Sequence, residues 1–295
     1  MSDIKYKVRN AHPTSLGIKK PSLNLHIFEF TKFGIKELLM ENSSFNWQVV
    51  AASVTGTSHE KRSQPCQDAH CWRVLSNGVL VAAVADGAGS AALAEVGAKI
   101  AVEAVVETIC QQDLQPESDE EWQVFFTASL QVARAAVEAE AATREVAARD
   151  LACTLIAVVA TPELIAVAQI GDGAAVAGDS AGNAIALTVP PCGEYINETI
   201  FLISPNAIET AQFQVLRQKL PHLAVFSDGL QMLALKIPEG TPHQPFFAPL
   251  FRFSAEAKEE SDAKEQLESF LRSPRVSERT DDDLTLLLAT FSSNL

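Results

Sequence analysis

The stretch VLVAAVADGAGSAALAEVGAKIAV (residues 79–102) changes from a strand-like to a helix-like pattern at Asp86. Before Asp86, a valine-rich apolar run is typical of a buried strand. After it, Gly87 and Gly89 lead into apolar residues at helical spacing. Two kinds of site occur at such a junction: a glycine-rich turn that binds the phosphates of a dinucleotide, or a carboxylate that binds a metal ion.

The segments on either side of this stretch predict runs of strands and pairs of helices. Strands are expected at residues 47–54, 70–75, 78–85, 151–160, 163–170, 174–178, 184–189, 222–227 and 284–291, and helices at 90–110, 119–149 and 257–271. This order lacks the strict strand–helix alternation of a doubly wound sheet. It favours an α+β fold in which antiparallel sheets are covered by helix pairs.

The composition excludes several classes of protein. Hydrophobic residues make up 47% of the 295 residues, so the chain can bury a large core, and the net charge of −14 disfavours nucleic acid as a partner. No uncharged apolar run reaches the length of a membrane span, so no membrane partner is expected. The five cysteines form no CxxC pair, which predicts neither a disulfide framework nor a zinc site and favours a cytoplasmic location.

Residues 1–45 differ from the rest, because they carry seven basic and four acidic side chains. We interpret them as a basic N-terminal extension of a main domain at residues 46–295. Residues 23–30 could form a strand and 31–40 a short helix. Met40 remains an alternative start of the protein.

The dinucleotide interpretation rests on Gly87, Gly89 and Ala92, which match a G-x-G-x-x-A fingerprint. The charge of Asp86 would repel a pyrophosphate at the start of the following helix. The fingerprint also requires a second strand that ends in an acidic residue about 20 residues later. A helix is expected at that position, so the metal interpretation is favoured.

Further aspartates occur at the ends of predicted strands: Asp68, Asp172, Asp228 and the run 281–283. One Asp-Gly is most often a turn. Several aspartates at the ends of apolar strands can converge in space. Converged carboxylates repel one another unless protons or cations neutralise them. Oxygen ligands without a histidine or cysteine set indicate Mg²⁺ or Mn²⁺.

Six motifs, QPCQDAH, VADGAGS, ACTLIA, QIGDGAA, VFSDGL and TDDDLTLL, follow one another between residues 47 and 291. In order and spacing they resemble the bacterial-type PPM (PP2C-like) metal-dependent serine/threonine protein phosphatases. The resemblance implies a four-layer αββα sandwich, with two antiparallel sheets flanked by helix pairs. It also implies hydrolysis of phosphoserine and phosphothreonine on proteins by water activated at a two-metal carboxylate site.

The resemblance assigns roles to individual residues. Asp86 resembles the aspartate that bridges two Mn²⁺ or Mg²⁺ ions, with the Gly87 carbonyl as a ligand beside it. Asp228 and Asp282 resemble the other metal-binding aspartates. Asp68 resembles the acidic residue that orients the attacking water and could accept its proton. Two further motif residues are expected to be structural, namely Thr154 and Asp172.

The chain departs from the family pattern near the expected phosphate site. Ser63 occupies the place of the family's phosphate-binding arginine, so Arg62 is our candidate for catalysis and phosphate binding, with His59 as a second candidate for substrate binding. Gln67 replaces an acidic ligand of some relatives, and Asp150 is a candidate ligand for a third ion. The segment that replaces the family's flap could touch a phosphopeptide through Glu194, Asn197, Glu198 and Thr199.

The expected partners are a phosphoprotein substrate and a serine/threonine kinase that acts on the same targets. Because Arg62 is displaced and Gln67 is a weaker ligand than a carboxylate, an alternative stays open. The chain could be a catalytically weak pseudophosphatase that binds phosphoproteins as a regulator.

Overall fold

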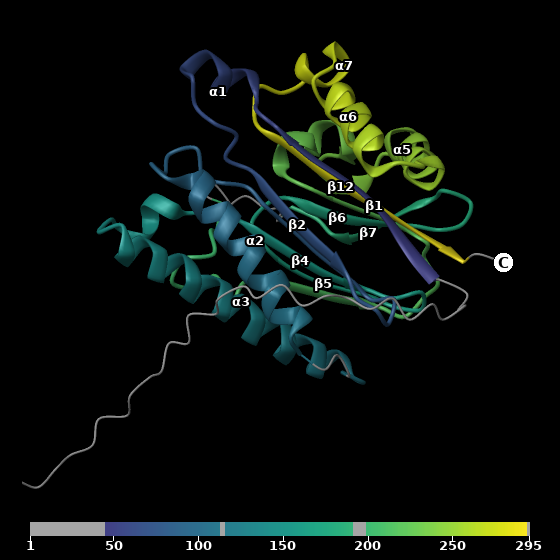
Figure 1. Ribbon diagram of the computed structural model, residues 1–295, viewed down its shortest axis with the longest axis horizontal. Coiled ribbons are helices and arrows are strands. Elements are labelled where there is room, and N and C mark those ends of the chain that lie inside the picture. Colours follow the sequence, from purple (N-terminus) through teal and green to yellow (C-terminus); the bar gives the residue numbers. More distant parts are fainter. Residues whose placement is uncertain (1–44, 113–115, 191–198, 294–295) are drawn as a thin grey trace, which may run out of the picture. The chain divides into compact units, whose positions relative to one another are not determined.

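Two five-stranded antiparallel sheets pack face to face at the centre of the fold (Figure 1). The first has the order β1 (Phe45–Val54), β12 (Leu284–Ser293), β9 (His222–Phe226), β6 (Ala174–Gly178) and β7 (Ala184–Thr188). The second has the order β2 (Ala69–Val74), β3 (Leu80–Ala85), β4 (Leu155–Ala160), β5 (Ile165–Ile170) and β8 (Gln212–Leu216). A small ribbon pairs β10 (Leu235–Lys236) with β11 (Thr241–Pro242).

This computed structural model describes residues 45–112, 116–190 and 199–293. The predicted N-terminal extension, its possible strand and helix, and the flap residues Glu194, Asn197 and Glu198 lie outside the described residues. The domain boundary at residue 45 therefore stays a prediction.

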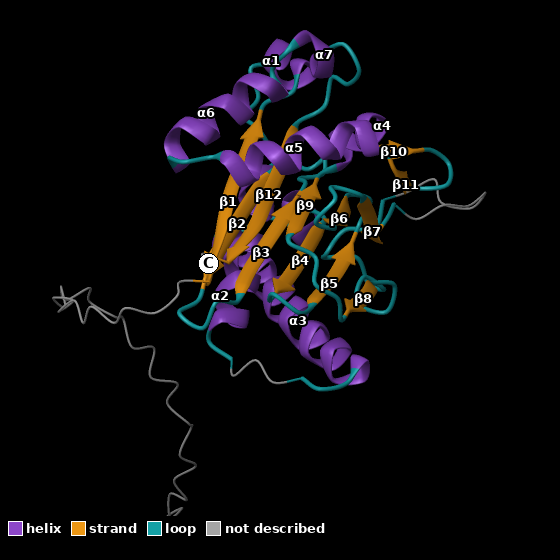
Figure 2. Ribbon diagram, turned by 90° about the vertical axis from the view of Figure 1, so that its right-hand side faces the viewer, coloured by secondary structure: helices purple, strands orange, loops and turns teal. Residues whose placement is uncertain are grey.

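Each sheet is covered on its outer face by a pair of helices (Figure 2). The helices α2 (Ala94–Cys110) and α3 (Asp119–Thr143) pack on the second sheet, and α5 (Gln244–Glu256) and α6 (Glu260–Leu271) pack on the first. The short helices are α1 (Thr57–Arg62), η1 (Ala148–Leu151), η2 (Asp228–Leu230), α4 (Gln231–Ala234) and α7 (Pro274–Ser277). No helix in the described part of the chain is both long and apolar enough to cross a membrane.

The alternation of side chains along β3 shows why the sheets are buried on both faces. Val81, Ala83 and Ala85 pack against the α2–α3 layer, whereas Leu80, Ala82 and Val84 pack between the two sheets. Successive side chains of a strand point to opposite faces, so a strand buried on both sides is apolar throughout. The predicted four-layer αββα sandwich is confirmed.

Several predicted boundaries were wrong, and several elements were not predicted, among them the long helix α5 and the strand β8. The helix α2 begins at Ala94 rather than residue 90, and α3 ends at Thr143, after which Glu145 takes a positive φ of 59°. The helix α5 was missed because it contains prolines, although the one in its first turn lacks only an N–H that would have no helical partner. The edge strand β8 was missed because its residues are half-buried and include two glutamines.

Candidate metal centre

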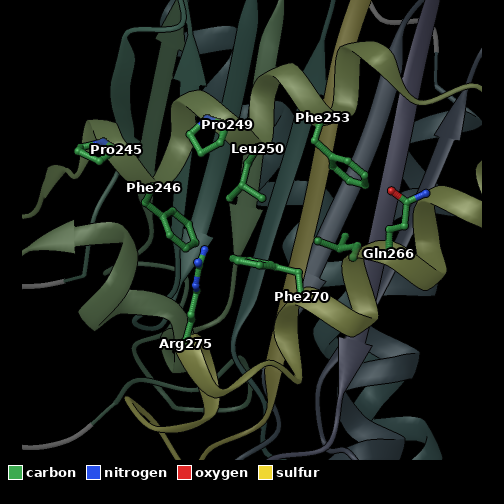
Figure 3. A pocket seen from close by; sticks show the side chains of 9 residues that line it. Pro245, Phe246, Pro249, Leu250, Phe253, Gln266, Phe270 and Arg275 are labelled. Atoms are coloured by element: carbon green, nitrogen blue, oxygen red, sulfur yellow. The ribbon is translucent and has the colours of Figure 1, made fainter.

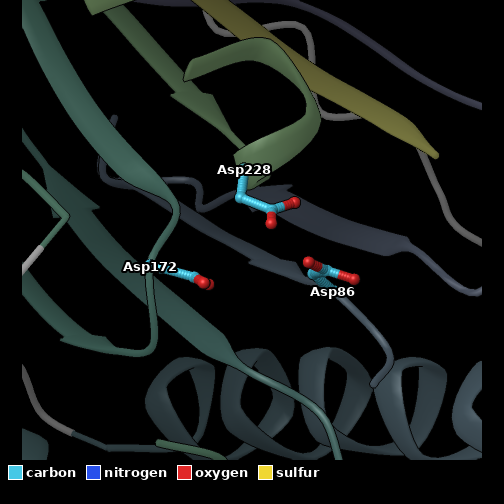
Figure 4. A group of neighbouring side chains, drawn as sticks. All are labelled: Asp86, Asp172 and Asp228. Carbon is cyan, nitrogen blue, oxygen red and sulfur yellow. The ribbon is translucent and has the colours of Figure 1, made fainter. Parts of the chain in front are cut away.

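Three aspartates meet where strands of the two sheets end (Figure 4). One carboxylate oxygen from each of Asp86, Asp172 and Asp228 lies within 4.8 Å of the others. All three are half-buried and point toward one another. Asp86 and Asp172 follow β3 and β5 of the second sheet, and Asp228 follows β9 of the first. The group therefore contains residues from both sheets.

Each of the three aspartates is followed by a glycine, and the glycine allows close packing of the strand ends. A Cβ atom on Gly229 would lie 2.2 Å from the carbonyl oxygen of Asp283, and one on Gly87 would lie 2.6 Å from that of Gln67. Such contacts are far inside van der Waals distance, so a side chain at either position would push the converging segments apart.

Backbone hydrogen bonds hold Asp86 in place. Its N–H donates to the Thr154 hydroxyl at 2.9 Å, and the Thr154 N–H donates to the Asp86 carbonyl oxygen at 2.8 Å. Gly87 pairs with Cys153 in an isolated β-bridge. Thr154 therefore supports the loop that carries Asp86, which agrees with the structural role that the resemblance implied for it.

Asp172 is the member of the cluster that sequence analysis did not expect to bind metal. The Thr199 hydroxyl donates to its Oδ2 atom at 2.7 Å, and the Gln231 side-chain amide donates to its backbone carbonyl oxygen. The available signal was its position: like Asp86 and Asp228, Asp172 precedes a glycine just after a buried strand.

Four buried side-chain oxygens around the cluster have no hydrogen-bond partner in the described part of the chain. They are Oε1 of Gln67 and the Oδ1 atoms of Asp68, Asp172 and Asp228. Buried acceptors are normally satisfied, because an unpaired polar atom costs free energy. The unpaired acceptors are all oxygens, the ligand atoms that hard divalent cations prefer, so these residues fit Mg²⁺ or Mn²⁺.

The pKa values of Asp86 and Asp228 are high in the absence of a cation. Burial raises the pKa of Asp86 well above its usual range, and the charges of Asp68 and Asp228 raise it further. Burial raises the pKa of Asp228 to about 6, with the charge of Asp172 as the next cause. Partial desolvation of its carboxyl group also raises the pKa of Asp282, although the residue as a whole is exposed. A bound cation would reverse these shifts, because it favours ionised carboxylates.

Asp68 lies beside the cluster and is only 8% exposed. Its Oδ2 atom accepts a hydrogen bond of 2.7 Å from the Ser227 hydroxyl, which in turn accepts from the Thr285 N–H. Burial raises the pKa of Asp68 to about 7, although the hydrogen bond from Ser227 acts in the opposite direction. A carboxyl group with such a pKa can exchange a proton near neutral pH.

Asp282 and Asp283 have different environments. Asp282 is exposed and lies outside the group of three aspartates, but its charge is among the causes that raise the pKa of Asp86. Asp283 is 2% exposed and accepts hydrogen bonds from Nδ1 of His59 at 2.8 Å and from the backbone N–H groups of Gly56 and Gln67. Asp283 thus anchors α1 and the segment before β2, which contains Gln67.

The remaining predicted site residues lie outside the group of three aspartates. His59 is 3% exposed, and its Nδ1 atom is bound to Asp283. Its contact with substrate stays a prediction. Arg62 is exposed in the last turn of α1, where its Nε donates to the Ser58 carbonyl oxygen at 3.1 Å. Asp150 accepts a hydrogen bond from the Ala147 N–H and is not in the cluster.

Comparison with known proteins agrees with this arrangement. Residues 55–272 match the family described as protein phosphatase 2C. The chain is 37% identical to Serine/threonine-protein phosphatase 3 of Escherichia coli K12 over 253 residues, which cover 84% of this chain and 99% of that protein. The chain therefore belongs to the protein phosphatase 2C family of serine/threonine phosphatases, and the predicted family and enzyme class are confirmed.

Solved structures share the fold at low sequence identity. The serine/threonine phosphatase of S. agalactiae gives a TM-score of 0.61 at 16% identity, covering 84% of this chain and 100% of that chain. The catalytic domain of the serine threonine protein phosphatase PstP, solved in complex with two manganese ions, gives a TM-score of 0.56 at 15% identity, covering 83% of this chain and 98% of that chain.

Proposed function

We propose that this enzyme hydrolyses phosphoserine and phosphothreonine on proteins with the help of Mn²⁺ or Mg²⁺ ions. The observation that carries the proposal is the convergence of Asp86, Asp172 and Asp228, together with the buried Oδ1 atoms of Asp172 and Asp228 that lack partners in the described chain. The PstP catalytic domain, which shares the fold, binds two manganese ions. The shared fold supports two ions in this enzyme as well. The same acidic site could hold a third ion.

The proposal gives each residue of the site a role. Asp86, the carbonyl of Gly87, Asp228 and Asp282 would hold the two ions, and Asp172 would add a carboxylate that sequence analysis did not assign. Bound divalent cations lower the pKa of water and neutralise charge on the phosphate oxygens.

The residues around the ions would complete the reaction. Asp68 would orient the attacking water and accept its proton through the Oδ1 atom, which has no partner in the described chain. Arg62 would bind the phosphate, since an exposed guanidinium can make two parallel hydrogen bonds to phosphate oxygens. Water would attack the phosphorus atom directly while the bond from phosphorus to the serine or threonine oxygen breaks, and the leaving oxygen would take up a proton from water. The described cysteines therefore need no catalytic role, and burial raises the pKa of Cys66 and Cys153, which disfavours their thiolates.

The proposed substrates are phosphoproteins, and a serine/threonine kinase with the same targets would be the functional counterpart. A cytoplasmic location is part of the proposal. It is supported by the free thiols of four described cysteines: Cys66, Cys71, Cys110 and Cys153.

The decisive experiment is hydrolysis of p-nitrophenyl phosphate and of a phosphoserine peptide in EDTA, Mg²⁺ or Mn²⁺. The wild type should turn over only with a divalent cation. Asp86→Asn should lose at least about 10²-fold in kcat while keeping its circular dichroism spectrum. A folded wild type that binds Mn²⁺ but hydrolyses neither substrate would replace the proposal with the pseudophosphatase alternative.

A further inference from the structure

An open groove runs between the outer helices α5 and α6 (Figure 3). Phe246, Leu250 and Phe253 of α5 face Leu267 and Phe270 of α6, and Arg275 of α7 closes one end. The groove has a volume of about 440 Å³. That volume lies within the range of cavities that bind ligands.

The residues at the floor of the groove belong to the buried core, whereas the aromatic residues of its walls remain partly exposed to solvent. Leu250 and Leu267 are buried, whereas the rings of Phe246, Phe253 and Phe270 are half-buried. The rings of Phe246 and Phe270 lie with their centroids 6.4 Å apart. The three half-buried rings leave apolar surface in one groove that the apolar side chains of a bound segment would cover.

The charge around the groove indicates the chemistry of the partner. Through Phe253 the groove continues into a second depression, which is lined by Glu256, Glu259 and Asp262 against a single Lys258. These three acidic residues are exposed, and none of them forms an ion pair with another described residue. A segment with apolar side chains next to lysine or arginine would match both depressions. Nucleic acid and anionic lipid surfaces would be repelled by the same carboxylates.

The groove also has a structural connection to the metal centre. Arg275 of α7 closes the groove, and Ser277 at the end of the same helix lines a depression that extends to Asp282. Leu271 and Arg272, at the end of α6, line that depression as well. A protein bound between α5 and α6 would therefore have its neighbouring segments beside the proposed catalytic site.

We propose that the α5–α6 groove docks a segment of the phosphoprotein substrate in which apolar side chains adjoin lysine or arginine. The apolar side chains fill the space between Phe246, Phe253 and Phe270. The basic side chains lie over Glu259 and Asp262. This inference rests on the proposed phosphatase function and specifies how the enzyme selects its substrates.

The binding test uses the full chain and peptides selected on it from a random peptide library. The selected peptides should share apolar residues followed by lysine or arginine. Measured by fluorescence anisotropy, Phe253→Ala should weaken their binding by at least about tenfold and Asp262→Lys by about fivefold. Glu265→Lys is the matched control, since Glu265 is exposed on α6 but lines neither depression, and it should change binding by less than about twofold.

The kinetic test compares a phosphoserine peptide with the same peptide joined to the selected segment. The segment should lower KM for the wild type by about tenfold and have little effect with Phe253→Ala, while all variants should hydrolyse p-nitrophenyl phosphate like the wild type. Active enzyme with no common motif among selected peptides, or with peptides that bind Phe253→Ala equally well, would overturn the docking inference alone. Groove binding without hydrolysis of any substrate would overturn the proposed function instead. A wild-type dimer that Phe253→Ala dissociates would show that the groove joins two copies of the chain, and would also overturn the inference.

Discussion

The hydroxyl of Thr199 donates a hydrogen bond of 2.7 Å to Oδ2 of Asp172, whose other carboxylate oxygen is buried without a partner in the described chain. The contact fixes the side chain of a cluster member from a segment that belongs to neither sheet. Groups that hydrogen-bond to a metal-binding side chain and fix its orientation contribute to metal affinity.

Thr199→Val should therefore weaken Mn²⁺ binding by about tenfold, because the carboxylate of Asp172 loses the donor that holds it. Isothermal titration of the purified protein measures this effect without reference to activity. Thr199→Ser is the matched control, since it keeps the hydroxyl and should bind like the wild type. Equal affinities of the valine and serine variants would show that the hydrogen bond does not position Asp172.

Asp283 should contribute more to stability than its exposed neighbour Asp281. Asp283→Ala removes the acceptor for buried donors on His59, Gly56 and Gln67, so we expect a loss of about 3 kcal/mol or more in the free energy of unfolding. Asp281→Ala should change it by less than about 0.5 kcal/mol. Urea unfolding in EDTA measures both variants without a contribution from bound metal, and similar midpoints would contradict the anchoring role.

Metal affinity should rise with pH between about 5.5 and 7.5. Burial raises the pKa of Asp68 to about 7 and that of Asp228 to about 6, so these groups retain protons at the acidic end of this range when no cation is bound. Cations bind ionised carboxylates, so binding must displace the protons. Affinity should therefore fall by up to about tenfold for each unit by which the pH is lowered, for each proton displaced. Titrations of Mn²⁺ in two buffers with different ionisation enthalpies would count the released protons.

The control for this pH dependence is Asp262→Asn, because Asp262 is exposed on α6 and lies outside the cluster, so the substitution should not alter the number of protons released. Affinity that is independent of pH, with no proton release, would show that the clustered carboxyl groups are already ionised before the cation binds.

Arg62 should act on the binding of phosphorylated substrate more than on turnover. Arg62→Ala should raise KM for a phosphoserine peptide by about tenfold, because a guanidinium can bind two phosphate oxygens at once. Arg62→Lys should recover only part of this effect, since an ammonium group lacks the planar pair of donors. Lys61→Ala is the matched control, as Lys61 is the exposed cation beside it. A larger effect of Lys61→Ala would assign the phosphate contact to Lys61.

Sequence patterns predicted the strands of the sandwich well and some other elements poorly. The strand β3 was predicted from its own residues, because burial on both faces requires a continuous apolar run. The helix α5 depends on packing of Phe247 and Phe251 against the first sheet, and this packing outweighs the prolines that locally disfavour a helix. Its partner α6 has the amphipathic spacing that made most of it predictable.

Within the site, the sequence by itself singled out aspartates at the ends of apolar strands as candidate metal ligands, although the family resemblance gave Asp172 a structural role. This much follows from local chemistry, since a carboxylate at the end of a buried strand is costly unless a cation, a proton or a donor neutralises it. Tertiary structure alone decided which of these aspartates meet. Asp86 and Asp172 follow strands of one sheet and Asp228 follows a strand of the other, so the three carboxylates converge only when the sheets pack face to face. The same packing buries Asp283 against His59 and leaves Asp282 exposed beside it, a difference that two adjacent identical residues cannot reveal in sequence.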